Sequence, residues 1–122
     1  MEDKKELVVI ISRGFDDERA SVAWSISNGG INSGLDVTVF LVSAGVDWVR
    51  KGAADKAHLN PIDPSMGDMI NSFRKNGGKI IVCPPCIDVR GYDPADIIDD
   101  VEVAGSVAVH ERIKRGAAAL SF

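Results

Sequence analysis

A chain of 122 residues has the length of one folded domain, because two separate cores of half that size would each be marginally stable. The composition is 45% hydrophobic and 26% charged, which is typical of a globular protein and excludes a disordered chain. The net charge of −4 and the scattered aromatic residues, 6% of the chain, provide neither a basic surface nor a stacking platform for nucleic acid. We therefore expect a single domain over residues 1–122.

The start of the chain mixes acidic and basic side chains and lacks the apolar segment of a signal peptide. The longest apolar run, Leu7 to Ile11, is too short to cross a bilayer. We therefore expect a cytoplasmic protein that binds neither membranes nor nucleic acid.

Three runs of apolar, largely β-branched residues predict three buried strands: Leu7–Ile11, Val37–Val42 and Lys79–Val82. Runs without alternation are typical of parallel strands that helices cover on both faces. Residues 16–32, between the first two runs, predict a helix that Asp16 or Asp17 caps and that ends before Gly34. The residues of its buried stripe are expected to be Ala20, Ala23, Trp24, Ser27 and Ile31.

The segment between the second and third runs predicts two helices, a short one over Val46–Lys51 and another that starts at Pro64-Ser65. Met66, Met69, Ile70 and Phe73 have the spacing of a buried helix face. The stretch 53–63 has no clear period, and a loop of this length is a candidate lid, with a plain surface loop as the equal alternative.

The last third of the chain predicts further short elements. We expect a helix that ends at Gly91, a turn over 95–99, a strand over Val101–Val103, a helix over 106–115 and a final strand over 117–122. The whole pattern predicts an α/β domain with a mostly parallel sheet of about five strands and helices on both faces.

The two cysteines, Cys83 and Cys86, directly follow the third predicted strand in a C-x-x-C spacing. The carboxyl ends of parallel strands share one edge of the sheet, so the loops 12–15, 43–45 and 83–86 should lie together there. A cysteine between a strand end and a helix start often has a lowered thiol pKa. Cys83 and Cys86 are therefore the candidate catalytic residues, and the candidate ligand-binding residues around them are Ser12, Arg13 and Arg90.

Other interpretations of the two cysteines remain open. Cys83 can be a small buried apolar residue at a strand end, and Cys86 can line the short helix. A thioredoxin-like enzyme is disfavoured, because its motif follows an early strand and precedes a long helix. Zinc is disfavoured because His58 and His110 do not form a second paired motif, so we expect no metal.

The chain resembles the DsrE/DsrF/TusD-like family of small sulfur-relay proteins, which share the YchN-like fold. The resemblance covers nearly the whole chain and is sharpest from Gly77 to Phe122. A strand leads into Cys83, and a short helix follows that ends at Arg90-Gly91. A Gly-containing helix start over 103–106 and a return to a final strand complete the pattern.

The resemblance implies a thiol-based, sulfurtransferase-like sulfur carrier with a persulfide on Cys83 and no other cofactor. It also implies a sulfur donor or acceptor protein as partner and a homo-oligomer, a trimer or a hexamer. Cys86 matches a second cysteine of some single-chain relatives. The alternatives are a non-catalytic oligomeric module that binds a small ligand or partner, and a redox protein that uses both thiols.

Overall fold

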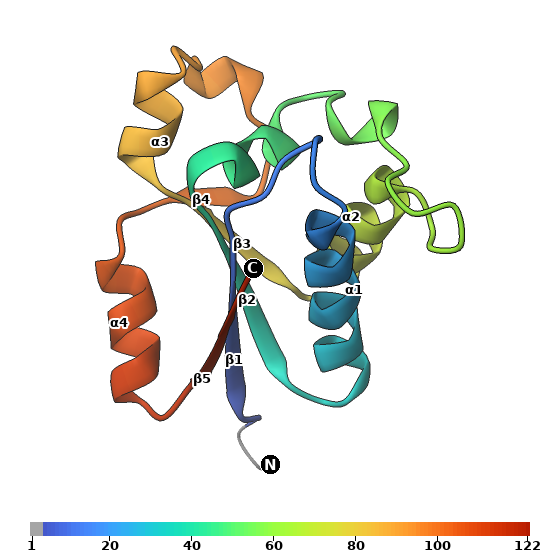
Figure 1. Cartoon of the computed structure of the whole chain (residues 1–122). Helices are drawn as coiled ribbons and strands as arrows, with labels where there is room; N and C mark the ends of the chain where they lie inside the picture. Colours follow the sequence, from blue (N-terminus) through green and yellow to red (C-terminus); the bar gives the residue numbers. More distant parts are fainter. Residues whose placement is uncertain (1–3) are drawn as a thin grey trace.

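The structure, a computed structural model, describes residues 4–122, so the first residues of the charged N-terminal segment lie outside the described part. It contains one sheet of five parallel strands in the order β4-β3-β2-β1-β5 (Figure 1). The strands are β1 (Glu6–Ile11), β2 (Asp36–Leu41), β3 (Lys79–Val82), β4 (Val101–Val103) and β5 (Ala118–Ser121). The predicted parallel α/β fold is confirmed, and every predicted strand is present.

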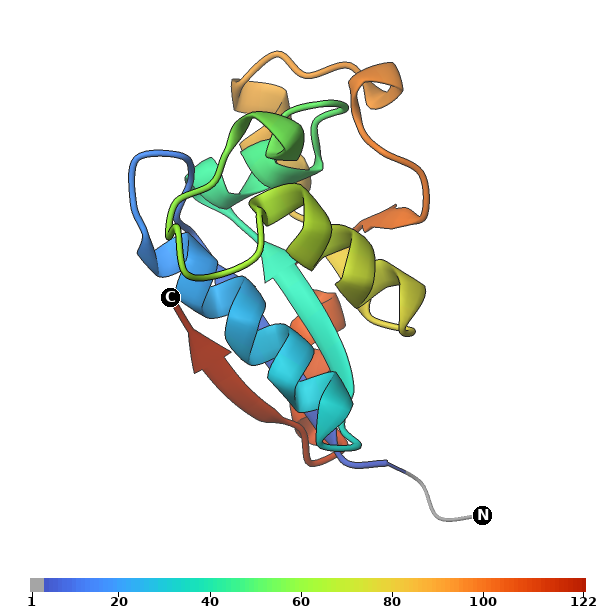
Figure 2. The same ribbon diagram turned by 90° about the vertical axis from the view of Figure 1, so that its right-hand side faces the viewer.

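The helices cover both faces of this sheet. Figure 2 shows α1 and α2 side by side in front of the sheet, with α4 behind it. This division follows from right-handed crossovers, because the chain advances from β1 to β4 in one direction and returns to β5 in the other. The α-helices are α1 (Arg19–Asn32), α2 (Met66–Lys75), α3 (Pro84–Val89) and α4 (Val107–Lys114), and the 3-10 helices are η1 (Ser43–Val49), η2 (Ala54–Lys56) and η3 (Pro94–Asp96). No helix within residues 4–122 is long and apolar enough to span a membrane.

Side chains that alternate along the strands build two cores of different size. The larger core lies under α1 and α2, and it includes Val9, Trp24, Leu41, Phe73 and Val82. The smaller core lies under α4 and consists of Val8, Phe40, Ile81 and Val109. Because β3 alternates between the two cores, its last residues set the direction of the side chain that follows it.

The start of α1 differs from the prediction. Neither Asp16 nor Asp17 is its N-cap, because the helix begins at Arg19 and the capping position is Glu18. The Asp17 carboxylate instead accepts hydrogen bonds from the backbone and guanidinium of Arg19. The predicted buried stripe is correct at Ala20, Ala23, Trp24 and Ser27, which are all fully buried, whereas Ile31 is partly buried against the same core.

The element after β2 also begins earlier than predicted, at Ser43 rather than Val46, and it is a 3-10 helix. Gly45 permits this, because a Cβ atom there would lie 2.1 Å from the carbonyl oxygen of Ile11. The indole N–H of Trp48 donates to the carbonyl oxygen of Arg13 at 2.8 Å. These contacts attach η1 to the loop after β1.

The loop 53–63 is partly ordered by η2 and lies against α1 and α2. The Ser21 hydroxyl donates to Asp63 at 2.9 Å, and the backbone N–H of Met66 donates to Ala57 at 3.2 Å. In Figure 1 α3 lies at the upper left of the molecule, and this loop lies on the right-hand side. The loop is therefore placed over the helices rather than as a lid over Cys83.

Candidate functional site

Cys83 lies at the carboxyl end of β3, as the sequence predicted. Its backbone N–H donates to the carbonyl oxygen of Leu41 at 3.1 Å, which continues the pairing with β2 by one residue. Its side chain is half-buried and packs against the smaller core, the one that contains Ile81. The sulfur is therefore held at the end of a buried strand and remains partly open to solvent.

Cys86 lies in the first turn of α3 and turns to the opposite side of the sheet, where it packs against the larger core. Its sulfur accepts a hydrogen bond from the backbone N–H of Ser43 at 3.2 Å. Ser43 has a positive φ of 50°, an uncommon backbone conformation for a non-glycine residue. The loop after β2 thus holds Cys86 by a main-chain donor.

Ser43 is a site residue that the sequence did not single out, although its loop was predicted to lie near Cys83. The other expected loop contacts are also present. A Cβ atom on Gly14 would meet Ala44 at 3.2 Å, which brings the loops after β1 and β2 together. The three loops therefore gather at one edge, as parallel topology requires.

The two thiols differ in their electrostatic surroundings. Burial raises the pKa of the Cys83 thiol above its ordinary value, and the neighbouring Cys86 thiol raises it further. The backbone N–H of Cys86 acts in the opposite direction and offsets only part of this effect. The expected lowering of the Cys83 pKa is therefore wrong, because the thiol is partly buried and α3 brings a second sulfur rather than a cation beside it.

Arg90 lies close to the pair but contacts neither sulfur in the hydrogen bonds of residues 4–122. Its Nη1 donates to the carbonyl oxygen of Cys86 at 3.1 Å, and its Nε lies 3.9 Å from Asp47. The Tyr92 hydroxyl also donates to Asp47. Arg90 therefore connects α3 to η1 and supports the backbone that carries Cys86.

Ser12 and Arg13 lie at the same edge, on the far side of β2 from Cys83. The Ser12 hydroxyl donates to the carbonyl oxygen of Phe122 at 2.8 Å, and Arg13 pairs with Asp17 at 3.6 Å. Because β2 separates β1 from β3, the ends of those two strands are roughly 10 Å apart. The structure therefore groups Ser12 and Arg13 with the end of β5 rather than with the cysteines.

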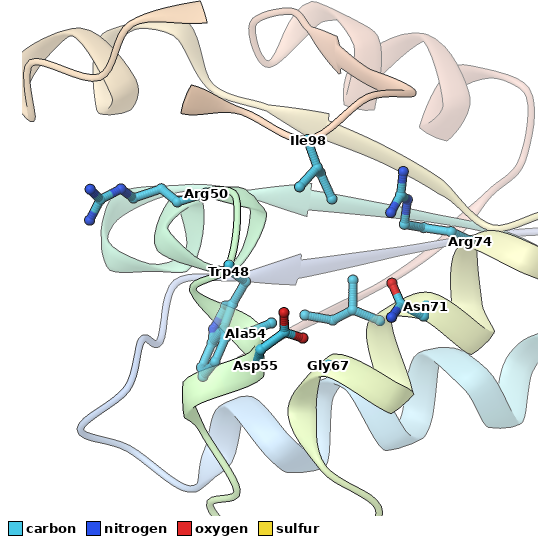
Figure 3. A pocket seen from close by; sticks show the side chains of 10 residues that line it. Trp48, Arg50, Ala54, Asp55, Gly67, Asn71, Arg74 and Ile98 are labelled. Carbon is cyan, nitrogen blue, oxygen red and sulfur yellow. The ribbon is translucent and has the colours of Figure 1, made fainter. Parts of the chain in front are cut away.

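Open space adjoins the helix of the cysteine pair. A groove of about 540 Å³ between α3 and β4 is lined by Pro84, Ile87, Val101 and Val103. A second cavity, of about 100 Å³, is lined by Trp48, Asp55, Asn71 and Arg74, and neither cysteine borders it (Figure 3). Neither cysteine lines the α3–β4 groove, and it approaches the pair only through Pro84, the residue after Cys83. No three His, Cys, Asp or Glu side chains among residues 4–122 are grouped to hold a metal ion.

The model of the DsrE/DsrF-like family matches residues 4–122. The chain is a member of the DsrE/DsrF-like family. The family is associated with sulfur relay in general. Curated relatives of this DsrE/DsrF-like chain include uncharacterized protein MK0008 of Methanopyrus kandleri, 30% identical over 80% of this chain and 76% of that protein.

Uncharacterized protein MJ0760 of Methanocaldococcus jannaschii is 28% identical over 83% of the DsrE/DsrF-like chain, which spans only 37% of that relative's length. Among solved structures, the ychN protein from E. coli superposes with a TM-score of 0.78 and 20% identity, over 98% of this chain and all of that one. This likeness confirms the predicted YchN-like fold.

Proposed function

We propose that this protein is a thiol-based sulfur carrier, sulfurtransferase-like in its chemistry, which holds sulfane sulfur as a persulfide on Cys83. The observation that carries the proposal is the position of Cys83, half-buried at the carboxyl end of β3 with a second thiol beside it. Membership of a sulfur-relay family supports the same chemistry. A half-buried sulfur suits a carrier, because a persulfide must be accessible to one partner and shielded from stray thiols.

Transfer to this site is a displacement at sulfur. The Cys83 thiolate attacks the outer sulfur of a donor persulfide, a new sulfur–sulfur bond forms, and the donor leaves as its thiol. Because burial raises the pKa of the Cys83 thiol, the thiol must first lose its proton to solvent before it attacks. The outer sulfur is then passed to an acceptor thiol by the same reaction.

The experiment is to treat the protein with a low-molecular-weight persulfide, remove the excess and measure the intact mass. The Cys86→Ser protein is expected to gain one sulfur atom that maps to Cys83, whereas Cys83→Ala is expected to gain none. Absence of added sulfur in folded Cys86→Ser protein, or equal addition to Cys83→Ala, contradicts the proposal.

We also propose that the chain forms a homo-oligomer, a trimer or a hexamer, and exchanges sulfur with a partner protein. The support is an apolar edge: all four residues of β5 are exposed, with Leu120 at 44%, and Val107 of α4 is 68% exposed. Exposed apolar edge strands are usually covered by another chain. Light scattering should give a multiple of the monomer mass, and Leu120→Lys should reduce it, whereas a monomeric wild type contradicts the proposal.

A further inference from the structure

The two sulfurs are held in different directions, and only the sulfur of Cys86 accepts a hydrogen bond from Ser43. Cys86 Sγ receives a backbone N–H and packs against the larger core, so it is fixed toward the interior of the site. Cys83 Sγ packs against the smaller core, on the other side of the strand end.

The first turn of α3 keeps the two sulfurs within reach of each other. Cys83 is the N-cap, Cys86 follows one turn later, and Pro84 and Pro85 fix the backbone between them. Residues three apart on a helical turn are neighbours, with Cβ atoms about 5–6 Å apart. A disulfide needs its Cβ atoms about 3.5–4.5 Å apart, so a small shift of the first turn of α3 is enough to form one. The influence of the Cys86 thiol on the Cys83 pKa agrees with this proximity.

We infer that Cys86 is a resolving cysteine, which attacks a persulfide on Cys83, releases its outer sulfur as hydrosulfide and leaves a Cys83–Cys86 disulfide. The inference rests on the proposed function, because it needs sulfur on Cys83. It adds an activity that a simple carrier lacks, the reduction of sulfane sulfur within one chain.

The reaction balances without a further reagent. The Cys86 thiolate forms a bond to Cys83 Sγ, the bond between Cys83 Sγ and the outer sulfur breaks, and the outer sulfur leaves with the electron pair. Cys86 is oxidised from thiolate to disulfide, and the outer sulfur is reduced to hydrosulfide, which takes the persulfide proton with it. A dithiol reductant then restores both thiols before the next cycle.

The test follows hydrosulfide release and the state of both thiols after loading with a low-molecular-weight persulfide. We expect wild type to release one hydrosulfide per chain at least tenfold faster than Cys86→Ser, a control whose hydroxyl still accepts the Ser43 N–H but cannot form a disulfide. A single tryptic peptide over 80–90 contains both cysteines. In wild type it should become two hydrogens lighter, and in Cys86→Ser one sulfur heavier.

The test distinguishes failure of the resolving role from failure of the carrier proposal. If wild type keeps the added sulfur on Cys83 and retains a free Cys86 thiol, the resolving role is wrong and the carrier proposal stands. If folded Cys86→Ser gains no sulfur, the carrier proposal itself is wrong.

Discussion

The backbone N–H of Ser43 donates to the sulfur of Cys86 across 43 residues of sequence, and it does so from a left-handed backbone conformation with φ of 50°. A residue that must adopt positive φ here cannot be branched at Cβ without added strain. The identity of residue 43 therefore affects both the stability of η1 and the position of the donor.

We predict that Ser43→Val lowers the free energy of unfolding by about 1–2 kcal/mol, because a β-branched residue is strained at positive φ. Ser43→Gly should change it by less than about 1 kcal/mol, because glycine adopts this conformation freely but gains entropy in the unfolded chain. Urea unfolding measures both. In a Cys83→Ala background, Ser43→Val should also slow the alkylation of Cys86, whereas Ser43→Gly should not. Equal alkylation rates in the two variants would show that the position of the Ser43 N–H does not affect the reactivity of Cys86.

The Cys83 thiol should react slowly with iodoacetamide at neutral pH. Burial and the Cys86 thiol raise its pKa, so the reactive thiolate is scarce until the pH exceeds the ordinary range of cysteine, about 8.5. In Cys86→Ala the second cause is absent, and the midpoint of the rate–pH curve should move to lower pH. Because the burial of Cys83 remains in this variant, the midpoint should stay above the ordinary pKa of a cysteine thiol. A Cys83 midpoint below that value in wild type contradicts the prediction.

The close approach of two loops gives a matched pair of glycine substitutions. In Gly45→Ala the new methyl group would lie 2.1 Å from the backbone oxygen of Ile11, so the loops after β1 and β2 must separate. We expect a loss of about 3 kcal/mol or more, because the obstacle is backbone rather than a mobile side chain. Gly29→Ala is the control: it lies in α1 with nothing within 4 Å, and it should stabilise by about 0.5–1 kcal/mol.

Much of the fold is predictable because its signals are local. The unbroken apolar runs correspond to β1, β2 and β3, and the helix face of Met66, Met69, Ile70 and Phe73 is buried. Glycines that were expected to end helices, such as Gly34 and Gly91, have positive φ. Each of these features depends on residues within about two turns or one strand, so the sequence contains enough information to place them.

The site was only partly predictable, because its details depend on contacts between distant segments. Ser12 contacts Phe122 because β5 joins the sheet beside β1, and no local pattern specifies that order. The cap of α1 was wrong because Asp17 binds the side chain of Arg19. The raised pKa of Cys83 depends on the burial of its side chain against the smaller core and on the second thiol. The C-x-x-C spacing does not specify how either acts on the thiol.

The Asp17–Arg19 pair predicts a pH dependence of stability. The Arg19 side chain donates to Asp17 at 2.6 Å, and hydrogen bonds from its guanidinium and backbone lower the pKa of the Asp17 carboxyl to about 2. In the unfolded chain this pKa is about 3.9. The folded protein therefore binds fewer protons between these values, so the contribution of Asp17 is complete above about pH 5 and is lost as the pH falls toward 2.

Urea unfolding of wild type and Asp17→Asn at several pH values measures that contribution as the difference between their midpoints. We expect the difference to be constant from neutral pH down to about pH 5 and to shrink below it. Arg19→Gln should give a pH dependence of the same sign but smaller, because the backbone N–H of residue 19 and the Arg13 side chain still act on Asp17. The double variant should lose little more than Asp17→Asn alone, because the two changes share the side-chain pair. A difference that grows as the pH falls, or two single effects that add fully, would show that the pair is not the cause.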